Sequence, residues 1–145
     1  SEPGTGAAGG MGAMLRVLLG AELKSGAEAV LEAVHFDELL TEADLVITGE
    51  GCLDGDSVDS GKAVGTVLRH AAAREVPAAV IAGCFGEGYE RAAKLGSVAL
   101  KSCINRPMTL EYAMEHSEEL LSLAAEELLR GVAAVRNTRT RLLSR

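Results

Sequence analysis

An apolar run that stops at a Gly-Glu-Gly triplet constrains the fold of this chain most strongly. Residues 44–48 read DLVIT, and the triplet occupies residues 49–51. A short apolar run ended by glycines is typical of a buried strand. Three more acidic side chains and two hydroxyls follow, and a helical pattern then starts at residues 61–62. We expect this strand to deliver carboxylates to the carboxyl edge of a parallel sheet, where open α/β sheets bind their ligands.

The rest of the chain alternates between short apolar runs and helical patterns. The run AAVIA at 78–82 has no polar alternation, which indicates a strand buried on both faces. Alternating strands and helices predict an α/β fold with a parallel sheet and flanking helices, a Rossmann-like or flavodoxin-like layer. The expected strands are 44–48, 78–82 and 98–101; the expected helices are 10–19, 27–34, 62–75, 89–95 and 108–136, with a turn at 37–40 and a break in the last helix near His116 and Ser117.

Three strands are few for a complete domain, so we expect an incomplete portion of a larger, two-lobed protein. The predicted division is a glycine-rich loop with helices at 1–43, a portion of an α/β domain at 44–136, and a loosely ordered tail at 137–145. Exposed sheet edges in such a portion make self-association plausible.

Charge and cysteine usage narrow the class of protein. The formal net charge of −7 disfavours binding to nucleic acid. The longest apolar run is far shorter than a membrane span, so we expect no membrane partner. The three cysteines match neither a zinc pattern nor a disulfide framework, which favours a reducing, cytoplasmic location. Cys84, at the end of the second expected strand, is interpreted as a packed thiol.

A glycine-rich loop opens the chain with the sequence PGTGAAGGMG at 3–12. It contains G-x-G-x-x-G at Gly4, Gly6 and Gly9, but no strand precedes it, as a dinucleotide fingerprint requires. Its glycines let backbone N–H groups approach an anion, and the helix that follows adds a partial positive charge. Phosphate or a small carboxylate would suit this loop. A connector between two lobes, with glycines that serve tight packing, is an equally good interpretation.

The acidic residues after the first strand are the second candidate site. Glu50 lies between two glycines, and Asp54 follows it closely; their oxygens suit Mg²⁺ bound to a substrate phosphate. An aspartate could also accept the proton of an attacking hydroxyl. Asp56 and Asp59 are interpreted as solvated turn residues. Lys62 stands at a helix start, where the dipole prefers an anion, so it either binds a phosphate or leans toward Asp59.

The chain resembles the bacterial glycerate kinase family in its C-terminal part. The resemblance rests on PGTGAAGGMGAMLRVLLGAELKSGAEAV, DLVITGEGCLDGDSVDSGKAVG and PAAVIAG, and it covers most of residues 3–135. It implies a two-lobed enzyme more than twice as long, which uses ATP and Mg²⁺ to phosphorylate D-glycerate, giving 2-phosphoglycerate. The active site would lie in a cleft between the lobes, and an N-terminal lobe would supply much of the sheet.

The same resemblance implies roles for individual residues. Glu50, Asp54 and Lys62 would be catalytic, and Glu50 and Asp54 would also hold Mg²⁺. The residues implied to bind substrate or nucleotide are Gly4, Gly6, Gly9, Gly10, Gly12, Gly49, Gly51 and Ser57.

The chain departs from the family pattern near these residues. Cys52 stands where the family usually has arginine, Asp56 where it has glutamine and Ser57 where it has threonine. The first two changes oppose the binding of anions. Two interpretations therefore stay open: a kinase segment that is inactive alone, and a degenerate relative that acts as a ligand-binding or structural module.

Overall fold

Three parallel strands form the centre of the molecule. The computed structural model describes residues 7–96 and 98–143. The central strand β2 (Ala78–Phe85) pairs with β1 (Val46–Leu53) on one side and with β3 (Val98–Ser102) on the other. This arrangement confirms the predicted α/β fold with a parallel sheet.

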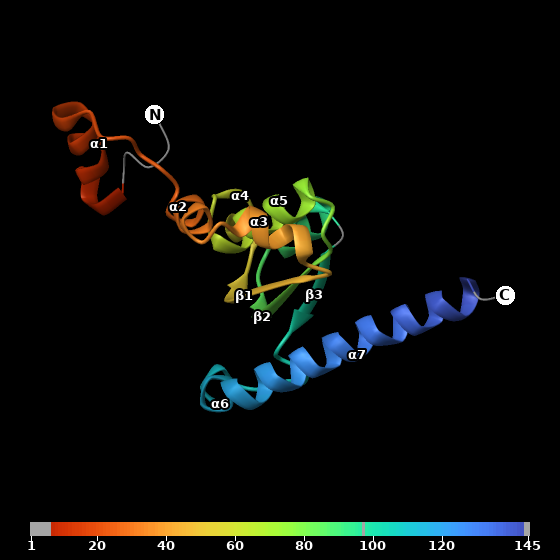
Figure 1. Ribbon diagram of the computed structural model, residues 1–145. Coiled ribbons are helices and arrows are strands. Elements are labelled where there is room, and N and C mark those ends of the chain that lie inside the picture. The colour runs from red at the N-terminus through yellow and green to blue at the C-terminus, as the bar shows by residue number, and fades with distance from the viewer. Residues whose placement is uncertain (1–6, 97, 144–145) are drawn as a thin grey trace.

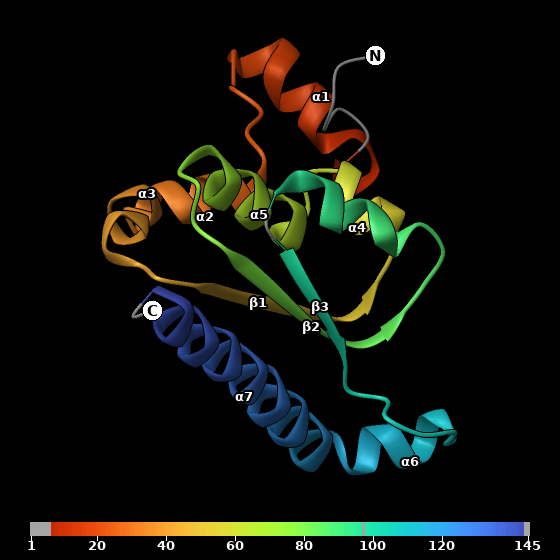
Figure 2. The ribbon, with the colours of Figure 1, turned by 90° about the vertical axis from the view of Figure 1, so that its right-hand side faces the viewer.

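Helices cover the two faces of the sheet unequally, as Figures 1 and 2 show. The first face carries α2 (Gly26–Ala33), α3 (Phe36–Leu39), η1 (Leu40–Glu42), α4 (Gly55–Asp59), α5 (Ala63–Ala73) and η2 (Tyr89–Leu95). The second face carries α6 (Leu110–Glu115) and α7 (Ser117–Leu143). Helix α1 (Ala7–Leu19) stands apart from both layers in Figure 1.

The core lies between the sheet and α5. Val64, Leu68 and Ala71 are spaced by four and three residues, so they share the face of α5 that turns to the sheet. Leu68 is 1% exposed, and burying a side chain of this size contributes about 1.5–3 kcal/mol. The strand side of the core is supplied by Leu53, Ala78, Val80 and Ala82.

The second face of the sheet is only partly covered. Helix α7 contacts β2 and β3, where Leu120 and Ala124 are buried. Leu121 and Leu129, on the same helix, are each about half exposed. The predicted break near His116 is confirmed, because α6 ends there and α7 begins at Ser117. The backbone of α7 continues to Leu143, beyond the predicted boundary at 136.

Two boundaries near the acidic residues were predicted wrongly. The first strand does not end at residue 48, because Cys52 and Leu53 still pair with Cys84 and Phe85 of β2. Pairing with a neighbouring strand here overrides the weak strand preference of Gly-Glu-Gly. The segment after Asp54 is not a loop but the short helix α4.

A search for membrane-spanning helices among residues 7–96 and 98–143 finds none that is long and apolar enough.

Candidate active site at the carboxyl edge of the sheet

Asp54 connects β1 to α4 at the carboxyl edge of the sheet. Its backbone is extended, with φ −135° and ψ 177°, which is the conformation of an N-cap residue. Its Oδ1 accepts a hydrogen bond from the backbone N–H of Ser57 at 2.8 Å. This bond lowers the pKa of Asp54, with smaller contributions from the Ser57 hydroxyl and the positive charge of Lys62. The Asp54 carboxylate is therefore ionised at neutral pH.

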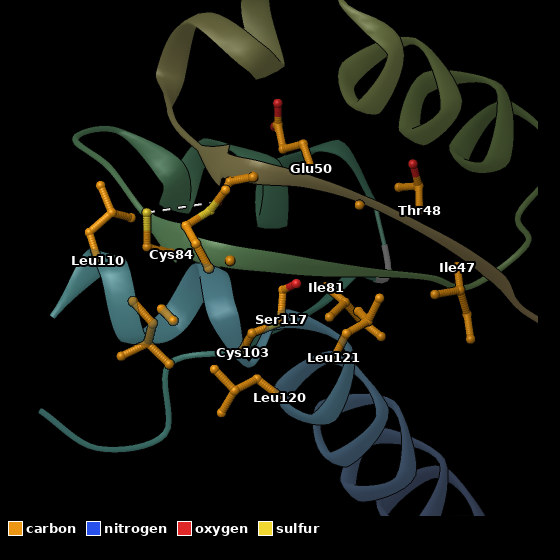
Figure 3. Close-up of a pocket in the computed structure, with 16 residues that line it drawn as sticks. Ile47, Thr48, Glu50, Ile81, Cys84, Cys103, Leu110, Ser117, Leu120 and Leu121 are labelled. Carbon is orange, nitrogen blue, oxygen red and sulfur yellow. Dashed lines mark hydrogen bonds between the residues drawn. The ribbon is translucent and has the colours of Figure 1, made fainter. Parts of the chain in front are cut away.

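Glu50 reaches the same serine from within β1. Ser57 Oγ donates a hydrogen bond to Glu50 Oε2 at 3.0 Å, and the serine is only 2% exposed. In Figure 3 the Glu50 side chain points away from α7. Its second oxygen, Oε1, is buried and has no hydrogen-bond partner among the described residues. An unpaired buried oxygen is costly, and a bound donor or cation would offset that cost.

Ser57 thus holds both predicted carboxylates, one through its N–H and one through its hydroxyl. It was predicted to bind substrate or nucleotide, and that role stays a prediction. Its contact with Glu50 was not anticipated from the sequence. The sequence did contain a signal for the Asp54–Ser57 bond. An N-cap aspartate accepts from the backbone N–H two or three residues later, and Ser57 lies three residues after Asp54.

Lys62 lies just after this constellation, as the N-cap residue of α5, and is exposed. Asp59 forms an ion pair with Arg91, with 2.6 Å between Asp59 Oδ2 and a guanidinium nitrogen. The positive charge of Lys62 instead helps to lower the pKa of Asp54. The interpretation in which Lys62 leans toward Asp59 is therefore not supported. Gly61 has a φ of +72°, and its carbonyl accepts a hydrogen bond from Ser25 Oγ, which ties the turn before Lys62 to α2.

The two glycines of β1 differ in what surrounds them. A Cβ on Gly49 would lie 2.2 Å from the backbone oxygen of Ile81, so a glycine is needed for the close approach of β1 and β2. A Cβ on Gly51 would have nothing within 4 Å. Gly49 therefore has a packing role that the sequence did not reveal, and ligand binding by either glycine stays a prediction.

The described part of the glycine-rich loop, residues 7–12, does not lie at this site. Gly4 and Gly6 lie outside the described residues. Gly9, Gly10 and Gly12 belong to α1, which stands apart from the sheet (Figure 1). Gly9 and Gly10 have φ values of +67° and +91°, and a Cβ on either would have nothing within 4 Å. Anion binding by this loop stays a prediction.

An apolar groove of about 600 Å³ lies on the other side of β1, facing α6 and α7. Figure 3 shows Ile47 pointing toward this side and the Glu50 side chain pointing the opposite way. Glu50 is one of the residues that line the groove, but its side chain points away from α7, and Asp54 and Ser57 do not line it. The mostly apolar lining suits an apolar partner better than a phosphate. Its apolar side chains include Ile47, Ile81, Leu110, Met114, Leu120 and Leu121.

The residues present do not form a complete metal cage. Among the described residues, no group of three or more His, Cys, Asp or Glu side chains could hold a metal ion. Mg²⁺, however, usually takes one or two protein carboxylates together with substrate phosphates. Glu50 and Asp54, with the unpaired Oε1 of Glu50, meet that smaller requirement.

The family profile and the individual relatives that match this chain all point to glycerate kinases. The profile of the glycerate kinase family matches residues 1–133. A glycerate kinase from Halalkalibacterium halodurans is 44% identical over 128 residues, which are 88% of this chain and 33% of that protein. A glycerate 2-kinase from Escherichia coli is 36% identical over 126 residues, which are 87% of this chain and 33% of that protein.

A solved structure extends the similarity to the fold. A crystal structure of a protein assigned as glycerate kinase 2 from Salmonella typhimurium superimposes with a TM-score of 0.61 at 31% identity. The match covers 92% of this chain and 34% of that chain. The chain therefore spans about a third of the length of the relatives it matches.

Proposed function

The chain belongs to the glycerate kinase family, and from this premise we propose that it forms the acidic part of the active site of an ATP-dependent glycerate kinase. The proposed reaction transfers the γ-phosphoryl group of ATP to D-glycerate, giving 2-phosphoglycerate. The observation that carries the proposal is the constellation of Glu50, Ser57 and Asp54 at the carboxyl edge of the sheet, where α/β folds bind ligands.

Each residue of the constellation has a proposed role. Asp54 keeps a negative charge at neutral pH, which suits an oxygen ligand or a base for the attacking hydroxyl. Glu50 offers the buried Oε1, and Ser57 fixes its orientation. Lys62 is proposed to contact a phosphate. Phosphoryl transfer needs chiefly such positioning and charge stabilisation.

Mg²⁺ would enter with ATP and would be held by Glu50 and Asp54. When bound, it would offset the negative charge of the phosphate oxygens during transfer. Backbone N–H groups of the glycine-rich loop would bind phosphate or carboxylate once the loop is placed against the cleft.

The remaining two thirds of a glycerate kinase are the proposed partner of this chain. Helix α1 is apolar, yet its residues Val17, Leu18 and Leu19 are 71–80% exposed. A helix with this exposure normally packs against another part of a protein. The apolar groove beside β1 is a second uncovered surface. The part that the relatives possess and this chain does not span is the natural occupant of both.

A coupled assay of ADP release tests this proposal. The chain would be measured alone and joined to the remaining portion of the enzyme, with D-glycerate and ATP–Mg²⁺. We expect no turnover by the chain alone and clear turnover by the joined protein. Turnover by the chain alone would overturn the need for a second part. A folded joined protein without turnover would overturn the kinase proposal.

The second candidate function is a catalytically degenerate, ligand-binding or structural module. It is favoured by Cys52 and Asp56, two exposed residues that stand where the family usually has an arginine and a glutamine. Restoring the arginine with Cys52→Arg in the joined protein separates the candidates. A lower KM for substrate would indicate an anion contact at this position, and turnover gained only in this variant would favour the degenerate relative.

A further inference from the structure

Two cysteine side chains meet at the carboxyl ends of β1 and β2. The register pairs Cys52 with Cys84, so the two side chains extend from neighbouring positions. Neighbouring strands lie about 4.7–4.9 Å apart. This spacing falls within the Cα separation of about 4.4–6.8 Å that a disulfide spans. The Cys84 thiol also turns toward β1, because its Sγ donates a hydrogen bond to the backbone oxygen of Gly51, the residue before Cys52, at 3.8 Å.

The two thiols differ in accessibility. Cys52 is exposed and Cys84 is half-buried, and both are free thiols in the structure.

We propose that Cys52 and Cys84 form a reversible redox pair that closes to a disulfide beside the Glu50–Ser57–Asp54 constellation. The register of the two strands and the orientation of the Cys84 thiol toward β1 carry this inference. It goes beyond the proposed function and does not depend on kinase activity. The bond would join the two strand ends directly before Asp54.

The oxidant is a small disulfide such as oxidised glutathione. The Cys52 thiolate attacks one sulfur of the oxidant, forms a mixed disulfide and releases one reduced thiol. The Cys84 thiolate then attacks the Cys52 sulfur and releases the second. The two cysteines together lose two protons and two electrons, and the small disulfide is reduced to two thiols. Cys52 attacks first because it is the more exposed sulfur.

Thiol trapping tests the pair in the full-length protein that carries this chain. The protein is equilibrated at graded ratios of reduced to oxidised glutathione, quenched with acid, alkylated and digested with trypsin. Lys62 and Arg91 separate the three cysteines into different peptides. We expect a cross-linked peptide containing Cys52 and Cys84 that increases with the oxidised fraction and disappears on reduction.

Variants show whether the link is specific. Cys103→Ser should leave the yield of the cross-link unchanged, because Cys103 follows a different strand. Cys52→Ser should leave Cys84 reduced or bound to glutathione. Three results would overturn the proposal: thiols that stay reduced throughout, glutathione adducts without a cross-link, or cross-links that involve Cys103 as often. The main measurement uses the unsubstituted protein, so a misfolded variant cannot obscure it.

Discussion

At the scale of single residues, Ser57 is the residue on which the candidate site depends. It is buried, and it donates to Asp54 through its N–H and to Glu50 through its hydroxyl. The side-chain bond fixes one oxygen of Glu50 and leaves Oε1 for a ligand. Removing the hydroxyl should therefore affect both the stability of the fold and the geometry of Glu50.

Ser57→Ala should lower the free energy of unfolding by about 1–3 kcal/mol, because it leaves the part-buried Oε2 of Glu50 without its donor. Denaturant unfolding measures this change. Ser60→Ala is the matched control, since Ser60 is exposed and bonds only to a backbone oxygen. Equal losses in the two variants would contradict the role assigned to Ser57.

At the scale of elements, the approach of β1 to β2 depends on one glycine. Gly49→Ala would place a Cβ 2.2 Å from the Ile81 oxygen, which the strands cannot accommodate without shifting. We expect a loss of about 1–3 kcal/mol or more in unfolding free energy. Gly51→Ala, two residues along the same strand, meets nothing within 4 Å and should lose much less. A thermal melt in which both variants match wild type would refute the packing role of Gly49.

His70 links α5 to the preceding helices and makes this link pH-dependent. Its Nδ1 lies 2.6 Å from Asp37 Oδ1, and its Nε2 lies 2.9 Å from Glu28 Oε2. The hydrogen bond to Asp37 and then that to Glu28 raise the pKa of His70. Stability from the charged imidazole is fully present below the unfolded pKa of about 6.5 and is lost as pH rises through the folded value. Asp37 has a lowered pKa, so it stays ionised over this range.

His70→Gln should therefore lower the melting temperature more at about pH 5.5 than at about pH 9. Melting curves of the variant and the wild type over this range give the difference directly. His35→Gln is the control, because the His35 side chain is exposed and its Nδ1 lies 3.6 Å from Glu38 Oε1, farther than either carboxylate lies from His70. If the difference in melting temperature between His70→Gln and the wild type stays constant with pH, the ion pairs of His70 do not provide the stabilisation.

The sequence predicted which elements form better than it predicted where they end. Val64, Leu68 and Ala71 repeat at helical spacing, and the run at 78–82 is uniformly apolar, so α5 and β2 were expected correctly. The extension of β1 through Gly-Glu-Gly depends on pairing with β2, which local sequence does not encode. Helix α4 has only five residues, too few for a hydrophobic period. Its N-cap, Asp54, was its one local signal.

At the scale of the whole molecule, the chain corresponds to one part of longer proteins. It spans about a third of its relatives, and its apolar helix α1 and the groove beside β1 are uncovered. The sequence predicted that both carboxylates lie at the carboxyl edge of the sheet, while a cleft shared with a second lobe stays a prediction. Glu50 and Asp54 are placed by strand pairing and an N-cap within the chain. The position of the glycine-rich loop depends on what covers α1, which lies beyond local sequence.

The central claim is that Glu50 serves catalysis at the carboxyl edge of the sheet. The most direct measurement is kcat for Glu50→Gln in the joined, full-length enzyme at saturating D-glycerate and ATP–Mg²⁺. Glutamine keeps an oxygen that accepts from Ser57, so the fold should survive, while kcat should fall by roughly 10²–10⁴-fold. Glu111→Gln, at an exposed position of α6, is the control. A folded Glu50→Gln enzyme with kcat within about twofold of wild type, well below the loss expected for such a group, would contradict the claim.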